Sequence, residues 1–132
     1  MRTPMTEKPS YFAPQHTSLK AILNDRKLAS LGDAYVNFVY SLALSKKRGK
    51  ATGTKVNSLI LSQALRKAAL RELLPKRTDR HALGDATEAL IVYAWIQGAI
   101  TIEESVTTLL SSDSATKAFS SLLSLAKERL NL

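Results

Sequence analysis

The sequence predicts an all-α fold, and three observations lead to that class. Apolar residues recur at three- and four-residue spacing, no stretch alternates in the manner of a half-buried strand, and glycine, proline and capping residues divide the chain into helix-length segments. The 132 residues are the size of one compact domain with a substantial core. We therefore expect a single helical domain over residues 17–132, preceded by a flexible N-terminal arm over residues 1–16.

The arm is predicted from its prolines. Pro4, Pro9 and Pro14 each lack a backbone donor and bias the preceding residue away from helix. The segment has no apolar core of the kind that a secretory signal needs. The longest uninterrupted apolar run of the chain, residues 89–96, is far shorter than the roughly 20 residues of a membrane-spanning helix. We expect no membrane span and a cytoplasmic location.

The first half of the domain is predicted to hold three helices. A short helix over about 17–24 is followed by a long one over about 26–45, where the apolar spacing is helical. The segment 46–54, KKRGKATGT, breaks the pattern with two glycines. A third helix then ends before Pro75, and it is marked by Val56, Leu59, Ile60, Gln63, Ala64 and Leu70.

Capping residues define the second half. Thr78 or Asp79 is placed to cap a fourth helix that runs to about Gln97, with Gly98 as its C-terminal cap. Thr101 followed by Glu104 is a capping box and opens a fifth helix to about Leu110. Ser112 or Asp113 is expected to cap a sixth. Its apolar stripe consists of Ala115, Phe119, Leu122, Leu123, Ala126 and Leu130.

Two of these helices carry very little charge. Asp33 is the only charged residue between Lys27 and Lys46, and Asp85 and Glu88 are the only ones between Arg80 and Glu103. Both helices are therefore expected at the centre of the bundle. Their aromatic residues are most simply explained as core, namely Tyr35, Phe38 and Trp95.

The tetrapeptide LGDA occurs once in each of these helices, at 31–34 and at 83–86. Glycine costs about 1 kcal/mol inside a helix, so a repeated glycine calls for a reason. Close approach of the two helix backbones would supply it. In that arrangement Asp33 would face Asp85 and Glu88, which share one side of their helix because they are three residues apart.

Three carboxylates gathered in partly dry surroundings repel one another and require a positive partner. The charge-poor stretches of the two helices contain no Lys or Arg, so a hard divalent cation, Mg²⁺ or Mn²⁺, is the expected partner. Such an ion suits metal-assisted phosphodiester hydrolysis. The alternative is a structural network in which each acid meets a basic residue of another segment, for instance Arg66, Lys67 or Arg80.

The charge balance favours a polyanionic partner. The formal net charge is +8, and the segment 46–80 alone holds eleven basic residues against two acidic ones. Charge by itself does not separate nucleic acid from an anionic membrane surface. The absence of cysteine excludes disulfides, thiolate metal sites and cysteine nucleophiles. The basic residues expected to contact RNA phosphates are Lys46, Lys47, Arg48, Lys50, Lys55, Lys76, Arg77 and Arg80.

Two polar residues lie one helical turn from the acids. Asn37 follows Asp33 by four residues, and His81 precedes Asp85 by four. Either residue could orient metal-bound water, or it could satisfy a local hydrogen bond only. Both interpretations remain open at this point.

Two segments resemble the ribonuclease III family. Residues 28–34, LASLGDA, resemble its signature helix, whose usual form is LEFLGDA, and residues 83–91, LGDATEALI, resemble its second metal motif, LADxFEALIG. Residues 55–58 with the amphipathic helix after them look like the segment between the two motifs. The resemblance covers about residues 20–105, with the motifs in the right order and at the right distance.

The resemblance implies a helical endonuclease domain that forms a two-fold dimer and uses Mg²⁺ to cleave double-stranded RNA, leaving 5′-phosphate and 3′-hydroxyl ends. Asp33, Asp85 and Glu88 match its metal-binding carboxylates. The chain departs from the pattern at Ala29, where a glutamate is usual, at Arg26, where an acid is common, and at Ser30, which replaces an aromatic residue.

The expected protein is a stand-alone ribonuclease III-like domain without a double-stranded-RNA-binding domain, similar in size to mini-ribonuclease III, which also lacks the glutamate at the Ala29 position. We expect a homodimeric, metal-dependent endoribonuclease for duplex or hairpin RNA. A non-catalytic domain that binds structured RNA is the alternative, and Ala29 favours it. A basic helical DNA-binding module is a third hypothesis, and it would not need the three acids.

Overall fold

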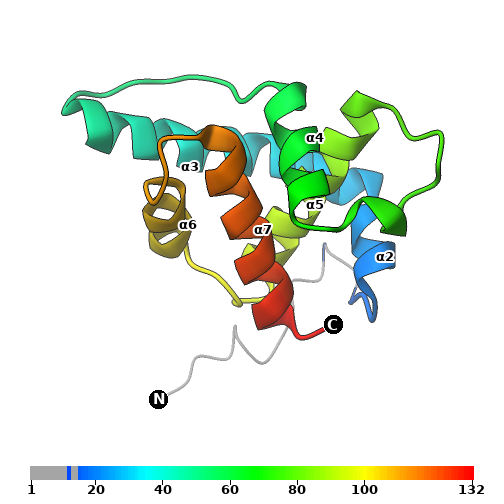
Figure 1. Ribbon diagram of the computed structural model, residues 1–132. Helices are drawn as coiled ribbons and strands as arrows, with labels where there is room; N and C mark the ends of the chain where they lie inside the picture. The colour runs from blue at the N-terminus through cyan, green and yellow to red at the C-terminus, as the bar shows by residue number, and fades with distance from the viewer. Residues whose placement is uncertain (1–11, 13–14) are drawn as a thin grey trace, which may run out of the picture.

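The computed structural model describes residue 12 and residues 15–132, and in these residues every regular element is a helix. The all-α prediction is therefore confirmed. The predicted arm, residues 1–16, lies largely outside the described residues. Figure 1 shows the arrangement. The elements in chain order are α2 (Leu19–Leu23), α3 (Arg26–Arg48), α4 (Ser58–Lys67), the 3₁₀ turn η1 (Arg71–Leu73), α5 (Arg80–Ile96), α6 (Ile102–Leu109) and α7 (Ala115–Leu130).

The helix boundaries follow the capping residues. Asp79 caps α5 through a hydrogen bond from the Ala82 backbone, so the alternative cap, Thr78, is wrong. The capping box at the start of α6 is confirmed in both of its hydrogen bonds. The predicted caps of the last helix are wrong, because Ser114 accepts the hydrogen bond from Lys117 and α7 begins one or two residues later than expected.

The third predicted helix is shorter than its apolar pattern suggests. α4 begins at Ser58 and ends at Lys67, because Ala69 has a left-handed backbone with φ of 62°. Leu70 is nevertheless buried, at 1% exposure, on the far side of this break. Val56 precedes the helix in an extended segment. Of the six residues predicted to mark this helix, Val56, Ala64 and Leu70 are buried, whereas Leu59 and Gln63 are exposed. The prediction missed Leu61 and Leu65, which supply the buried face of α4.

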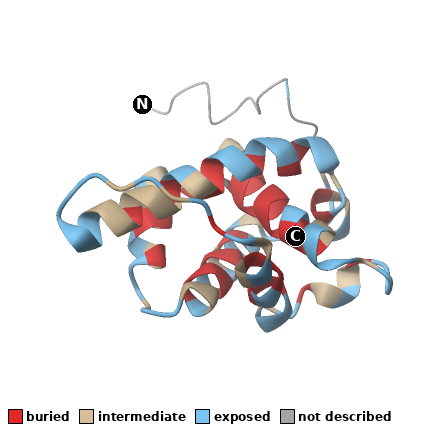
Figure 2. Ribbon diagram, turned by 90° about the horizontal axis from the view of Figure 1, so that it is seen from above, coloured by how far each residue is buried: buried red, intermediate tan, exposed pale blue. Residues whose placement is uncertain are grey.

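α5 is the central helix of the domain. It packs against α2, α3, α4 and α7. Every residue from Leu83 to Ala94 is buried except Asp85. Figure 2 shows this buried centre surrounded by half-exposed helices. The prediction of a central position is confirmed for α5.

α3 has only one buried face, so the prediction that it is central is wrong. Gly32, Tyr35 and Val36 lie on the buried face, whereas Leu31 and Phe38 are 39% and 53% exposed. Trp95 at the end of α5 is also exposed, at 38%. Two of the three aromatic residues assigned to the core therefore lie at the surface, because the described residues cover each of these rings only in part.

An extended segment returns along α3 after that helix ends, as Figure 1 shows above α3. We call residues 52–56 of this segment the strap. The Ser45 Oγ accepts from the Thr52 N–H at 2.8 Å and donates to the Thr52 carbonyl at 3.1 Å. The Ser41 Oγ makes the same pair of hydrogen bonds with Thr54, at 3.0 and 3.1 Å. Side chains of α3 thus hold the strap against the helix.

Within the described residues, no helix has the length and apolar character that crossing a membrane requires.

Candidate active site

The crossing of α3 and α5 depends on Gly32. A Cβ atom at this position would lie 2.6 Å from the backbone carbonyl carbon of Glu88 and 2.9 Å from its Cβ atom. Real Cβ atoms do not approach other atoms so closely, so only glycine permits this separation of the two helices. The prediction that a glycine brings the helices together is confirmed at Gly32.

Gly84 has a different neighbour. A Cβ atom there would lie 3.6 Å from the Cβ atoms of Leu61 and Ser58, which belong to α4. This is ordinary van der Waals contact. The prediction that both glycines serve the α3–α5 contact is therefore wrong for Gly84, which packs against α4.

The close approach brings two carboxylates into direct contact. Glu88, at 6% exposure, shares a side-chain hydrogen bond with Asp33. Burial and the negative charges of Asp33 and Asp85 raise the pKa of Glu88 to about 8, while the positive charge of Lys55 acts in the opposite direction. Glu88 is therefore largely protonated at neutral pH, which allows it to donate to Asp33.

The expectation of three buried acids is wrong for two of them, since Asp33 and Asp85 are exposed. Asp33 stands on the flank of α3, and Asp85 lies on the one exposed side of the central part of α5. Among the described residues, no three His, Asp or Glu side chains are grouped so that they could hold a metal ion. The acids are therefore brought to one region, with a direct contact between Asp33 and Glu88.

Ion pairs do not neutralise these acids in the described part of the chain. The pairs found there join His16 to Asp25, Lys47 to Asp113 and Arg129 to Glu104. The predicted alternative of a structural network with Arg66, Lys67 or Arg80 is thus not observed for Asp33, Asp85 or Glu88.

Asn37 contacts the site directly. Its Nδ2 donates to Asp33 Oδ1 at 3.1 Å, and its Oδ1 accepts from the Val56 N–H at 2.8 Å. His81, the other residue considered for orienting water, is exposed in the first turn of α5 and makes no side-chain hydrogen bond within the described residues. Sequence spacing alone did not distinguish Asn37 from His81, but in the structure only Asn37 is hydrogen-bonded to an acid of the site.

The basic residues divide into three groups, and all of them are exposed. Residues 46–50 lie at the end of α3, about 20 Å along the helix from Asp33 at a rise of 1.5 Å per residue. Lys55 belongs to the strap, which approaches the carboxylates. Lys76, Arg77 and Arg80 precede or begin α5. Lys47 is partly engaged, since its Nζ lies 3.0 Å from Asp113.

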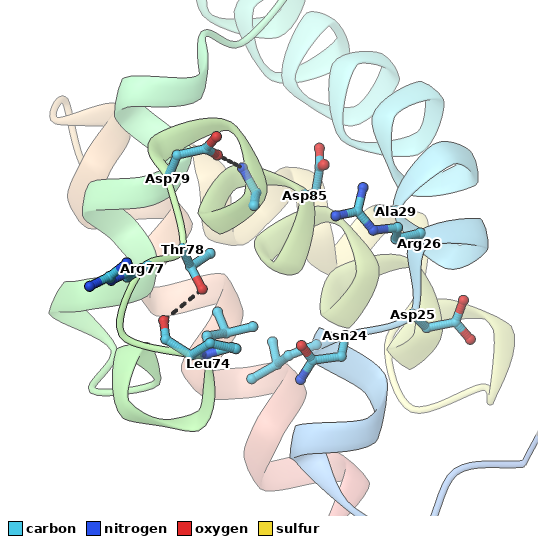
Figure 3. Close-up of a pocket in the computed structure, with 12 residues that line it drawn as sticks. Asn24, Asp25, Arg26, Ala29, Leu74, Arg77, Thr78, Asp79 and Asp85 are labelled. Carbon is cyan, nitrogen blue, oxygen red and sulfur yellow. Dashed lines mark hydrogen bonds between the residues drawn. The ribbon is translucent and has the colours of Figure 1, made fainter.

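A pocket of about 350 Å³ that was not predicted is lined by Asp85, but not by Asp33 or Glu88. Arg26, Ala29 and Asp85 contribute to its wall beside the α3–α5 crossing, and Arg77 and Thr78 contribute from the segment before α5. Figure 3 shows the Arg26 guanidinium extended toward the side of Asp85. The pocket combines the starts of two helices that are far apart in the chain, which is why local patterns do not reveal it.

Taken together, the fold and the site define an all-helical domain with a paired carboxylate at a helix crossing and basic residues on either side. A family model described as Ribonuclease III matches residues 26–132. The chain belongs to the ribonuclease III family. No curated protein matches the chain.

Proposed function

We propose that the protein is a divalent-metal-dependent endoribonuclease that cleaves double-stranded or hairpin RNA. The observation that carries the proposal is the contact between Asp33 and Glu88 across the α3–α5 crossing, with Asp85 close enough to raise the pKa of Glu88. Two acids at such short distance disfavour each other's charged form and favour a bound cation. Family membership over residues 26–132 supports an RNA substrate.

Mg²⁺ or Mn²⁺ fits the donor set. Carboxylate oxygens are the ligands that these hard cations prefer. The pKa of Glu88 is raised first by burial and then by the negative charges of Asp33 and Asp85, which Lys55 offsets only in part. No ion pair to these acids is found within the described residues. Asp33, Asp85 and Glu88 would hold the ion. The side chains of Asp33 and Asp85 are exposed, and that of Asp33 is held at the site by Asn37. The ion would supply Lewis-acid polarisation of a phosphate and a water of lowered pKa.

The other residues of the site orient a metal ligand or bind the RNA substrate. Hydrolysis breaks the bond between phosphorus and the 3′-oxygen, so that the water oxygen remains on the 5′-phosphate and a proton passes to the 3′-oxygen, which becomes the 3′-hydroxyl. Asn37 holds the Asp33 carboxylate in place. The exposed basic residues at 46–50, Lys55, Lys76, Arg77 and Arg80 contact backbone phosphates.

The active form is proposed to be a homodimer that uses the exposed apolar side of α3. Leu31 and Phe38 lie on one stripe of this helix because they are seven residues apart. Tyr35, between them, stacks on Trp95 with ring centroids 5.4 Å apart, so the exposed Trp95 extends the same surface. We expect sedimentation to show a dimer that Phe38→Asp dissociates, whereas the same change at Leu59, which is 46% exposed on α4, does not.

Cleavage of a labelled RNA duplex tests the proposed activity. The wild-type protein should cut with Mg²⁺ or Mn²⁺ and not with EDTA, and Glu88→Gln or Asp85→Asn should abolish cutting with the helical circular dichroism unchanged. The exposed Glu72→Gln on η1 is the matched control and should cut normally. Equal cutting by Glu88→Gln and wild type would contradict the assignment.

A structured-RNA-binding protein without nuclease activity is the second candidate. The specific observation in its favour is Ala29, which is 6% exposed on the wall of the pocket and offers no carboxylate to an ion. The same duplex would then bind in a salt-sensitive manner and remain intact in every metal.

A further inference from the structure

The strap and α3 share a matched spacing. Side chains four residues apart on the helix bind strap residues two apart, at Ser45, Ser41 and finally Asn37. Four helical residues advance about 6 Å, and two extended residues advance about 6.6 Å. The two distances agree closely. Successive turns of α3 therefore meet the N–H group of every second residue of the strap, at Thr52, Thr54 and Val56.

Asn37 ends this series and differs from the two serines. Each serine uses its hydroxyl for both the N–H and the carbonyl of one strap residue. Asn37 instead uses its oxygen for the Val56 N–H and its NH₂ group for the Asp33 carboxylate. One side-chain amide therefore links the strap to an acid of the proposed metal site.

This link determines where Lys55 stands. In an extended segment, neighbouring side chains point to opposite sides. Val56 is 9% exposed and points toward the core, whereas Lys55 is exposed. The anchored Val56 backbone thus leaves Lys55 on the outer side of the strap, one residue from the group that holds Asp33. Its positive charge reaches Glu88 from that position.

We propose that Asn37 is a positioning residue, which sets the Asp33 carboxylate and the strap in one fixed relation so that Lys55 contacts the RNA phosphate that is cut. The proposal rests on the proposed nuclease function. It assigns Lys55 a role distinct from that of the basic residues at 46–50, which are held about 20 Å away along α3 and contact phosphates of the flanking duplex.

The first experiment measures Mn²⁺ affinity without RNA. Asn37→Ala should weaken Mn²⁺ binding by roughly 10–100-fold, the usual effect of removing a residue that orients a metal ligand. Asn37→Leu keeps the approximate size of the side chain and loses both hydrogen bonds, so it should weaken binding as well. Ser45→Ala loses two strap hydrogen bonds about 12 Å further along the helix and should stay within about twofold of wild type.

The second experiment separates binding from cleavage at Lys55. Lys55→Met should lower kcat on duplex RNA at least about tenfold, with the Kd for RNA in Ca²⁺ or EDTA changed less than about threefold, and Lys55→Arg should restore part of the rate. Lys50→Met should do the reverse, weakening RNA binding and leaving kcat near the wild-type value.

Two outcomes overturn the inference. One is an Asn37→Ala protein that binds Mn²⁺ as Ser45→Ala does, and the other is a Lys55→Met protein that loses RNA affinity and retains kcat. Failure of the proposed function is recognised separately, because the wild-type protein would then leave RNA intact, or Glu88→Gln would cut as wild type does. The Mn²⁺ titration of the Asn37 variants does not depend on cleavage, and a wild-type protein that binds no Mn²⁺ would contradict the proposed metal site itself.

Discussion

The two copies of LGDA consist of the same four residues but have different surroundings in the fold. In the copy at 31–34, Gly32 lies against the backbone of Glu88, and Asp33 is hydrogen-bonded to the Glu88 carboxyl and to Asn37. In the copy at 83–86, Gly84 packs with ordinary spacing on α4, and Asp85 faces the pocket. The comparison shows that a repeated motif on two packed helices need not form a symmetric contact.

The largest expected effect on stability comes from adding a side chain at Gly32, where α3 and α5 cross. Gly32→Ala places a methyl group against the Glu88 backbone, which cannot move aside as a flexible side chain would. We expect a loss of about 3 kcal/mol or more in the free energy of unfolding, measured by urea denaturation. A protein as stable as wild type would show that α3 and α5 are not in close contact.

The next prediction concerns Glu88, the buried acid that contacts Gly32 and Asp33. The pKa of Glu88 rises from 4.5 in the unfolded chain to about 8 in the fold, so the folded state holds a proton that the unfolded state releases. Wild-type stability should therefore fall as the pH rises from about 4.5 to 8.

Glu88→Gln removes this dependence. In EDTA, we expect it to be more stable than wild type at pH 8, with the difference shrinking as the pH falls and vanishing near pH 4. Thermal unfolding across this pH range is the measurement, with Glu72→Gln as the exposed control. A constant difference at all pH values would contradict the raised pKa.

A smaller effect distinguishes the two aspartates. Asp33 acts on Glu88 through charge and a hydrogen bond, whereas Asp85 acts through charge alone. Asp33→Asn should therefore lower the pKa of Glu88 by about one unit, and Asp85→Asn should lower it less. A carboxyl-carbon NMR titration of Glu88 in the metal-free variants measures both values, and a reversed order would contradict the contact with Asp33.

The smallest effect belongs to the second glycine. Gly84→Ala adds a methyl group at ordinary contact distance from α4 and gains helix propensity. We expect stability to rise by up to about 1 kcal/mol, with cleavage and Mn²⁺ binding unchanged. Destabilisation comparable to that of Gly32→Ala would mean that the two copies are equivalent after all.

Local rules predicted much of this structure from the sequence. Asp79, Thr101 with Glu104, and Gly98 mark helix ends because capping is decided within a few residues. The choice of Ser114 over Ser112 and Asp113 was not predictable, since all three side chains can cap. The turn at Ala69 was not predictable either, because no glycine, proline, asparagine or aspartate lies next to it in the sequence.

Features that depend on distant packing were predicted less well. The sequence identified Asp33, Asp85 and Glu88 as one group, and the structure brings Asp33 and Glu88 into contact. It did not reveal that only Glu88 is buried, because exposure depends on which side of each helix other elements cover. For the same reason, Phe38 and Trp95 were assigned to the core and the pocket beside Asp85 was missed.

The paired spacing of the strap and α3 also limits how this region can change in length. One extra residue between Thr52 and Val56 would exchange the inner and outer sides of the segment, turning Val56 to solvent and Lys55 inward. Insertions should therefore be tolerated at Gly49, where an added Cβ atom would meet no described atom within 4 Å, and not inside the strap. A scan of single-residue insertions would trace the limits of this register.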